Sequence, residues 1–176
     1  ARLQGVVLIT GTILHLNVSP GGIPKRPVEE AYLAPGGLAG DSWAHPQFHG
    51  GPEKAILLIT LEGVEELIAQ GYPLYPGALG ENFTTAGLDR REIRLGDRFR
   101  AGQAVIEISK MRVPCATLNV FNGEGRPPIQ EVVFDKRVKA GDPSSPYWGL
   151  GGFYARVVRD GLIRSGDRIS RLDSIA

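Results

Sequence analysis

Glycine and proline punctuate this chain along its whole length. It holds 24 Gly and 13 Pro among 176 residues, against only 7% aromatic residues. These residues separate short apolar segments instead of gathering in one tail, so low-complexity disorder is the weaker explanation. Many short strands joined by shaped turns explain the pattern better. We therefore expect a mostly β protein with a few short helices at its periphery.

Length and charge limit the number of domains and the classes of partner. A chain of 176 residues can build one substantial core, so we predict a single domain over residues 1–176, with its core at about 5–172. The net charge of +1 argues against nucleic-acid binding, for which a strongly basic face is typical. We find no apolar run of bilayer-crossing length and no charged-then-apolar leader. These observations favour a cytoplasmic protein that binds neither nucleic acid nor membrane.

The single cysteine stands at the end of an apolar segment. Cys115 closes the string Met111-Arg112-Val113-Pro114-Cys115, which follows the alternating apolar run 104–108. One cysteine cannot form an internal disulfide, so the fold does not depend on oxidation. The guanidinium of Arg112 three residues earlier favours a thiolate, the form that attacks electrophiles and binds metals. The alternative is a buried cysteine that acts as a small hydrophobe, which is common for a lone Cys.

Two glycine-rich loops carry polar side chains that a plain linker does not require. In the loop 17–25, two glycines lie between two prolines, and the loop ends at Lys25. It is either an anion-binding loop, with backbone N–H groups and the ammonium acting together, or a surface turn with solvated cations. The loop 76–88 carries Glu81 and Asn82. Asn82 could read a heterocycle edge or hold a phosphate, or it could bond its own backbone in a hairpin turn.

Two of the three histidines lie in one loop, at His45 and His49. Pro46 between them argues against a helical pair of metal ligands. A zinc site would also need three or four ligands, which these histidines and one distant cysteine support poorly. His45 therefore fits an ordinary loop histidine. His49 has a second interpretation as a site residue, because the following Gly50-Gly51 lets a ligand approach the backbone closely.

Local signals also predict individual elements. The continuous apolar run 55–59 suits a strand that is covered on both faces. Thr60 then fits the N-cap of a helix that ends near Gly71. A short helix is predicted over Ile129–Lys136, after two prolines. The repeated Gly-Asp pairs at 96–97 and 166–167 predict strand-entry turns in a barrel, and Asp160-Gly161 predicts a closing hairpin.

Six strings occur in the order found in one known family. They are SPGGIPK (19–25), GLAGD (37–41), HGGPEKA (49–55), PGALGENFTTAGL (76–88), LGDRF (95–99) and RVPC (112–115). This order resembles MOSC domains, the molybdenum cofactor sulfurase C-terminal domains, and especially their stand-alone bacterial YiiM-type branch. The resemblance covers nearly the whole chain, from Gly5 to Leu172.

The resemblance implies a MOSC-type β-barrel with a few short helices that binds the molybdenum cofactor (molybdopterin). Cys115 would ligate molybdenum or carry persulfide sulfur, and a soft thiolate suits that metal. Asp41 would be a site residue or only a turn residue. The other implied assignments are Lys25 and Arg112 at the pterin phosphate and dithiolene, Gly50 and Gly51 beside the cofactor, and His49, Glu81 and Asn82 on the pocket wall.

The activity implied is reductive removal of oxygen from N-hydroxylated bases or related small molecules. Electrons would come from a separate reductase, and His49 and Glu81 are the expected proton donors. There is no pyridoxal-phosphate lysine domain, so we expect no pyridoxal phosphate and no self-supplied sulfur. A non-enzymatic alternative is a sulfur carrier or cofactor-handling module that receives a persulfide on Cys115 from a desulfurase. A third interpretation is a barrel scaffold with an inert thiol.

Overall fold

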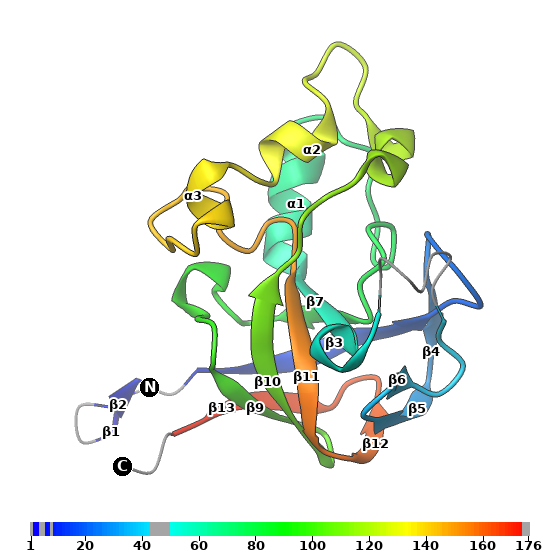
Figure 1. Ribbon diagram of the computed structural model, residues 1–176, viewed down its shortest axis with the longest axis vertical. Coiled ribbons are helices and arrows are strands. Elements are labelled where there is room, and N and C mark those ends of the chain that lie inside the picture. Colours follow the sequence, from blue (N-terminus) through cyan, green and yellow to red (C-terminus); the bar gives the residue numbers. More distant parts are fainter. Residues whose placement is uncertain (1, 4–5, 8, 43–49, 174–176) are drawn as a thin grey trace.

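Seven strands close into a barrel in the computed structural model, which describes residues 2–3, 6–7, 9–42 and 50–173 (Figure 1). Around the barrel their order is β13, β9, β10, β11, β7, β8 and β3, and β3 pairs back with β13. All neighbours are antiparallel except β7 and β8, which are parallel. The predicted mostly β barrel is confirmed. The barrel strands are β3 (Thr10–Val18), β7 (Ile56–Thr60), β8 (Phe83–Ala86), β9 (Arg98–Ala101), β10 (Ala104–Met111), β11 (Phe153–Arg159) and β13 (Arg168–Leu172).

The smaller strands lie outside the closed barrel. A short strand, β4 (Arg26–Val28), pairs with β3, and β1 (Arg2–Leu3) pairs with β2 (Val6–Val7). A separate sheet contains β12 (Gly161–Arg164), β5 (Glu30–Ala34) and β6 (Gly37–Leu38), in that order. The predicted hairpin at Asp160-Gly161 is wrong, because β12 pairs with β5 and not with β11. The chain instead leaves β11 and enters the separate sheet, where all four residues of β12 pair with β5.

The parallel pair β7–β8 requires a crossover, and α1 (Leu61–Ala69) supplies it. The Thr60 hydroxyl accepts a hydrogen bond from the Gly63 amide at 3.1 Å, which confirms the predicted N-cap. Gly71, with φ of 104°, lies just beyond the last turn as predicted. In the described part of the chain, no helix is long and apolar enough to cross a membrane.

The remaining helices are short. They are the 3₁₀ helices η1 (Pro52–Lys54), η2 (Arg90–Glu92) and η3 (Ala116–Phe121), and the α-helices α2 (Ile129–Val132) and α3 (Lys136–Lys139). The single helix predicted over Ile129–Lys136 is therefore two helices. The break occurs because the Asp135 carboxylate accepts the Val138 amide at 2.9 Å, which caps a new helix at that point.

Strand β7 separates the two apolar cores. Ile56 and Leu58 face the barrel interior, while Leu57 and Ile59 belong to the cluster that contains Val64 of α1. All five residues of β7 are buried, which confirms the strand covered on both faces. The barrel thus carries a second packed layer on the side of α1 and α2, and these helices lie together above the barrel in Figure 1.

The two Gly-Asp turns have the same hydrogen-bonding pattern. The Asp97 carboxylate accepts the Arg94 amide at 2.8 Å, and the Asp167 carboxylate accepts the Arg164 amide at 2.8 Å. Gly96 supplies a φ of 88° at the turn before β9, and the turn before β13 has the same form. Both predicted strand-entry turns are confirmed.

Candidate functional site

A cavity of about 400 Å³ lies at the end of the barrel where β10 finishes. Its wall comes from the β3–β4 loop, from β7, from residues 79–82 before β8, from residues 112–120 after β10, and from β11. The volume is within the range of small-molecule sites. Four of the predicted site residues lie on this wall, namely Lys25, Asn82, Arg112 and Cys115. Apolar side chains complete it, including Ile23, Leu57, Leu79 and Val120.

Cys115 is the one soft side chain among the predicted site residues on this wall. The residue is half-buried and extended (φ −125°, ψ 173°), at the start of η3. Its Sγ lies 2.8 Å from the Thr117 hydroxyl oxygen, which also lines the cavity. The thiol is therefore accessible from the cavity and has a hydrogen-bonding neighbour, so it is not sealed in hydrocarbon.

Arg112 brings a buried positive charge to the same wall. Its guanidinium donates to the Gly151 carbonyl at 3.2 Å and to the Leu79 carbonyl at 3.0 Å. Burial lowers the pKa of Arg112, while the charges of Tyr154, Cys115 and Glu81 act in the opposite direction. The two carbonyl contacts hold the guanidinium in one place before any ligand arrives.

Lys25 is held by Asp41, which turns out to be more than a turn residue. The Lys25 Nζ lies 2.6 Å from both carboxylate oxygens, and these side chains are 6% and 1% exposed. Asp41 also accepts the Ser19 amide at 2.9 Å and the Asn82 side-chain amide at 2.9 Å. Asp41 thus joins the β3–β4 loop to the segment that leads into β8, and it sets where Lys25 meets the cavity.

The side-chain amide of Asn82 forms its hydrogen bonds with other parts of the protein. Its Nδ2 donates to the Asn17 carbonyl and to Asp41, and its Oδ1 accepts the Leu57 amide at 3.0 Å. Both donors of the side chain are therefore engaged. Asn82 contributes to the wall of the cavity, but its amide donors are not available to read a heterocycle edge in this arrangement.

Glu81 lies behind this wall and is fully buried. Burial raises the pKa of Glu81 to about 7, against smaller lowering effects from backbone hydrogen bonds, from Thr84 and from the charge of Arg112. Its Oε2 accepts the Thr84 hydroxyl at 3.3 Å, whereas its Oε1 has no partner within the described residues. Glu81 is not part of the cavity lining, although the sequence placed it there.

Sequence reasoning missed two ionisable residues of the wall, Lys54 and Tyr154. The Lys54 ammonium lies 5.3 Å from the centroid of the Tyr154 ring. Burial, and then the neighbouring Lys110, lower the pKa of Lys54. Burial raises the pKa of Tyr154, with Arg112 opposing this rise and Cys115 adding to it. The string HGGPEKA contains Lys54, but its side chain could be placed only from the fold.

The described end of the loop that carries the two histidines, Gly50-Gly51, contributes no residue to the cavity wall. His45 and His49 lie outside the described residues, so the predicted role of His49 stays a prediction. Gly50 and Gly51 have φ of 90° and 89°, which suits a tight loop, but neither belongs to the cavity lining. Their predicted place beside the cofactor also stays a prediction.

Known proteins share this sequence pattern. A sequence profile of the MOSC domain matches residues 45–170. Bacillus subtilis YflK is 34% identical over 155 residues, which cover 86% of this chain and 63% of that protein. Escherichia coli YiiM is 37% identical over 105 residues, 57% of this chain and 47% of that protein. A Gibberella moniliformis protein named Reductase is 30% identical over 142 residues, 78% of this chain and 23% of that protein. The chain thus spans less than two thirds of each relative.

Solved structures share the fold. YiiM from Geobacillus stearothermophilus superposes with a TM-score of 0.65 at 26% identity, covering 93% of this chain and 75% of that one. YiiM from Escherichia coli has a TM-score of 0.66 at 22% identity and covers 94% of this chain and 71% of that one. The profile match covers well over half of the chain and agrees with the ordered strings of the sequence. This chain therefore belongs to the MOSC domain family, with YiiM-like proteins among its relatives.

Proposed function

We propose that this chain binds the molybdenum cofactor in the Cys115 cavity, with the thiolate as a metal ligand, and reduces N-hydroxylated bases or related N-oxygenated compounds. The observation that carries the proposal is the convergence of one thiol and three cationic side chains, Lys25, Lys54 and Arg112, on a cavity of about 400 Å³. The MOSC domain is associated with this cofactor, and a distant relative bears the name Reductase.

The residues of the cavity fit the chemistry of that cofactor. A phosphate-bearing ligand suits ammonium and guanidinium groups, and the apolar wall suits a flat pterin ring. Molybdenum with sulfur ligands suits the Cys115 thiolate. Within the described segments, no group of three or more His, Cys, Asp or Glu side chains could hold a metal. A metal at Cys115 would therefore arrive with most of its ligands already supplied by the cofactor.

Reduction of an N-hydroxyl group to N–H and water consumes two electrons and two protons. The bound cofactor would supply the redox chemistry, with a separate reductase as the proposed electron source. Lys54 is an ionisable group on the cavity wall, next to the Tyr154 ring, and we assign it the role of a proton donor. Glu81 lies behind the wall, and its pKa of about 7 lets it exchange a proton near neutral pH. His49 remains a proposed donor by family resemblance.

Metal analysis tests the ligand assignment. Protein purified from a host that makes the cofactor should carry about one molybdenum per chain, and it should reduce a hydroxylamino-purine with a chemically reduced donor. Cys115→Ser should lose both the metal and the activity while it keeps its melting temperature. Full molybdenum occupancy in Cys115→Ser would contradict the role of Cys115 as a ligand.

A matched lysine pair tests the proton at the wall. Lys54→Gln removes an ionisable group that lines the cavity, whereas Lys110→Gln removes a neighbouring lysine that does not. We expect Lys54→Gln to lower kcat by about a hundredfold with unchanged molybdenum content, and Lys110→Gln to stay within about twofold of the parent. Equal effects of the two substitutions would exclude Lys54 as a proton donor.

The sulfur-carrier alternative rests on the half-buried Cys115 thiol and on its Thr117 neighbour. In that function a desulfurase transfers one sulfur atom from its own persulfide to the Cys115 thiolate. Intact-mass measurement after incubation with a cysteine desulfurase and cysteine should show one added sulfur, which reductant removes. A mass that never changes, in protein that binds molybdenum, would exclude this alternative.

A further inference from the structure

A second hollow lies at the opposite end of the barrel from Cys115. Its volume is about 290 Å³, and the turns after β9 and before β13 shape it. The eight residues of β10 separate the two ends, because the hollow includes Gln103 just before that strand and the cavity begins at Arg112 just after it. A strand of this length spans about 26 Å. The hollow is therefore a site distinct from the Cys115 cavity.

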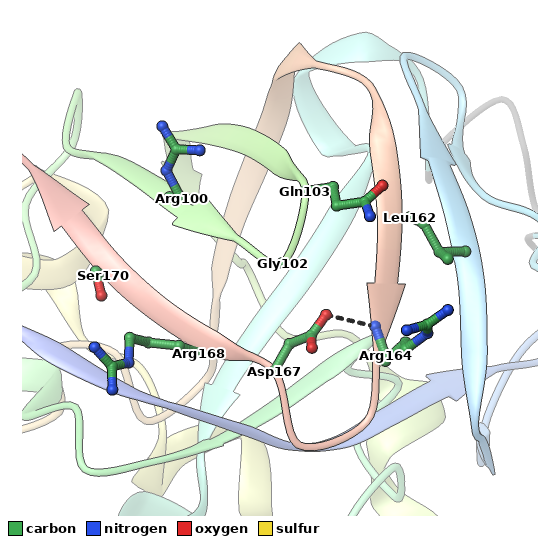
Figure 2. A pocket seen from close by; sticks show the side chains of 8 residues that line it. All are labelled: Arg100, Gly102, Gln103, Leu162, Arg164, Asp167, Arg168 and Ser170. Atoms are coloured by element: carbon green, nitrogen blue, oxygen red, sulfur yellow. Dashed lines mark hydrogen bonds between the residues drawn. The ribbon is translucent and has the colours of Figure 1, made fainter.

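Strand register places two arginines and a hydroxyl together on the outer face here. Ser170 of β13 is paired directly with Arg100 of β9, so both side chains leave the sheet on the same face. Arg168 precedes Ser170 by two residues and therefore points to the same face. The two arginines are then diagonal neighbours, about 7–8 Å apart at their backbones. Figure 2 shows Arg100, Ser170 and Arg168 on one side of the Asp167 turn, with Gln103 and Arg164 on the other.

These two arginines differ from the other arginines of the same strands. Arg98 pairs with Glu107 at 2.7 Å, and Arg171 lies 3.8 Å from Asp97. Within the described segments, Arg100 and Arg168 have no acidic partner. The charges that line the hollow are three guanidinium groups and the carboxylate of Asp167, and one of the three, Arg164, is paired with Glu30 at 3.1 Å. That carboxylate accepts the Arg164 amide at 2.8 Å, which holds its turn closed.

We propose that this hollow binds the phosphate group of a small phosphorylated ligand, with Arg100 and Arg168 as its cationic contacts and Ser170 as a hydroxyl donor. Guanidinium groups bind phosphate through paired, charge-assisted hydrogen bonds. The Ser170 hydroxyl lies 2.8 Å from the Thr10 hydroxyl, and Thr10 also donates to the Ile169 carbonyl at 3.4 Å. Ser170 can turn its proton outward when Thr10 gives up that longer bond and donates to Ser170 instead. The volume suits a phosphate with a small attached group. The site is independent of the chemistry at Cys115.

The test is a titration with inorganic phosphate and with a phosphomonoester at constant ionic strength, followed by backbone amide NMR of the full chain. We expect saturable shifts at Gly102, Gln103 and Ser170 that sodium chloride does not reproduce. Arg100→Gln and Arg168→Gln should each weaken binding about tenfold. Arg98→Gln is the matched control, because Arg98 lies on the same strand and is not part of the hollow. It should leave the affinity unchanged.

Three outcomes would overturn the proposal. One is the absence of saturable shifts at Gly102, Gln103 and Ser170. Another is equal weakening by Arg98→Gln, which would show a diffuse effect of surface charge. The third is a set of shifts confined to the Cys115 cavity and abolished by Arg112→Gln, which would assign the phosphate to that cavity. A larger affinity for the phosphomonoester than for inorganic phosphate would assign the attached group to the hollow as well.

Discussion

The two ends of the barrel present positive charge in opposite ways. At the Cys115 end, Lys25 and Arg112 are buried, and protein groups already hold them in place. At the other end, Arg100 and Arg168 are exposed and have no acidic partner among the described residues. Low dielectric strengthens the first set of interactions, whereas water screens the second. The comparison implies that removing a partner of the buried charges at the cavity end costs much stability, whereas removing a charge at the exposed arginine end costs little.

The largest contrast is expected between two carboxylates that each pair with a cation. Asp41→Asn removes the buried partner of Lys25 and leaves that ammonium uncompensated, which should cost about 3–5 kcal/mol of unfolding free energy. Glu30→Gln breaks the Arg164 pair, in which the side chains are 64% and 56% exposed, and should change stability by less than about 0.5 kcal/mol. Equilibrium denaturation measures both. Similar losses in the two variants would show that burial does not separate the ends.

A glycine pair sharpens the same contrast in the backbone. Gly77 has φ of 91°, its carbonyl accepts the Lys25 amide at 2.8 Å, and an added Cβ would collide with the Lys25 carbonyl oxygen. Gly166, in the turn before β13 at the arginine end, has φ of 92°, but an added Cβ would meet open space. We expect Gly77→Ala to lose about 2–4 kcal/mol and Gly166→Ala about 1–2 kcal/mol, the cost of backbone strain alone. Denaturation curves that coincide would contradict the tight packing around Lys25.

Glu81, behind the cavity wall, should make the free energy of unfolding depend on pH. Its pKa is raised to about 7 by burial, so the folded chain keeps this proton at pH values where the unfolded chain has lost it. The folded state then binds more protons, and stability falls as pH rises from about 4.5 to about 7, by at most about 3 kcal/mol. Glu81→Gln should flatten the curve in that window. Glu65→Gln, an exposed change on α1, should leave the slope as it is.

Much of the fold follows from local pattern, but the long-range pairing does not. The Gly-Asp turns, the Thr60 cap and the doubly buried β7 were predictable, because each depends on neighbouring residues. The hairpin at Asp160-Gly161 was predicted from the same kind of signal and was wrong. Its strands were locally suitable, but β12 pairs along its whole length with the distant strand β5. The pairing of a strand with a distant partner depends on the arrangement of the whole sheet, which local sequence signals do not contain.

The candidate site divides in the same way. Cys115, Lys25 and Arg112 were found because their chemistry stands out within the ordered strings, and the fold brings them to one cavity. Tyr154 was missed because it alternates with the core residues on its strand, which marks an outward face. Nothing local indicates that residues 112–120 cover that face. The hydrogen bonds of the Asn82 side-chain amide could not be predicted from the sequence either, because their partners lie far away along the chain.

The smallest expected effect separates paired from unpaired arginines on one strand. Arg98→Gln removes the 2.7 Å contact with Glu107 and should lower stability by a few tenths of a kcal/mol. Arg100→Gln removes a charge whose diagonal neighbour is another arginine, so it should raise stability by a similar amount. Both differences should shrink in high salt, because both are exposed interactions. Paired denaturation curves at low and high salt would show the opposite signs. Loss of stability in both variants would mean that Arg100 already has a partner, and that the arginine end resembles the cavity end more than its exposure suggests.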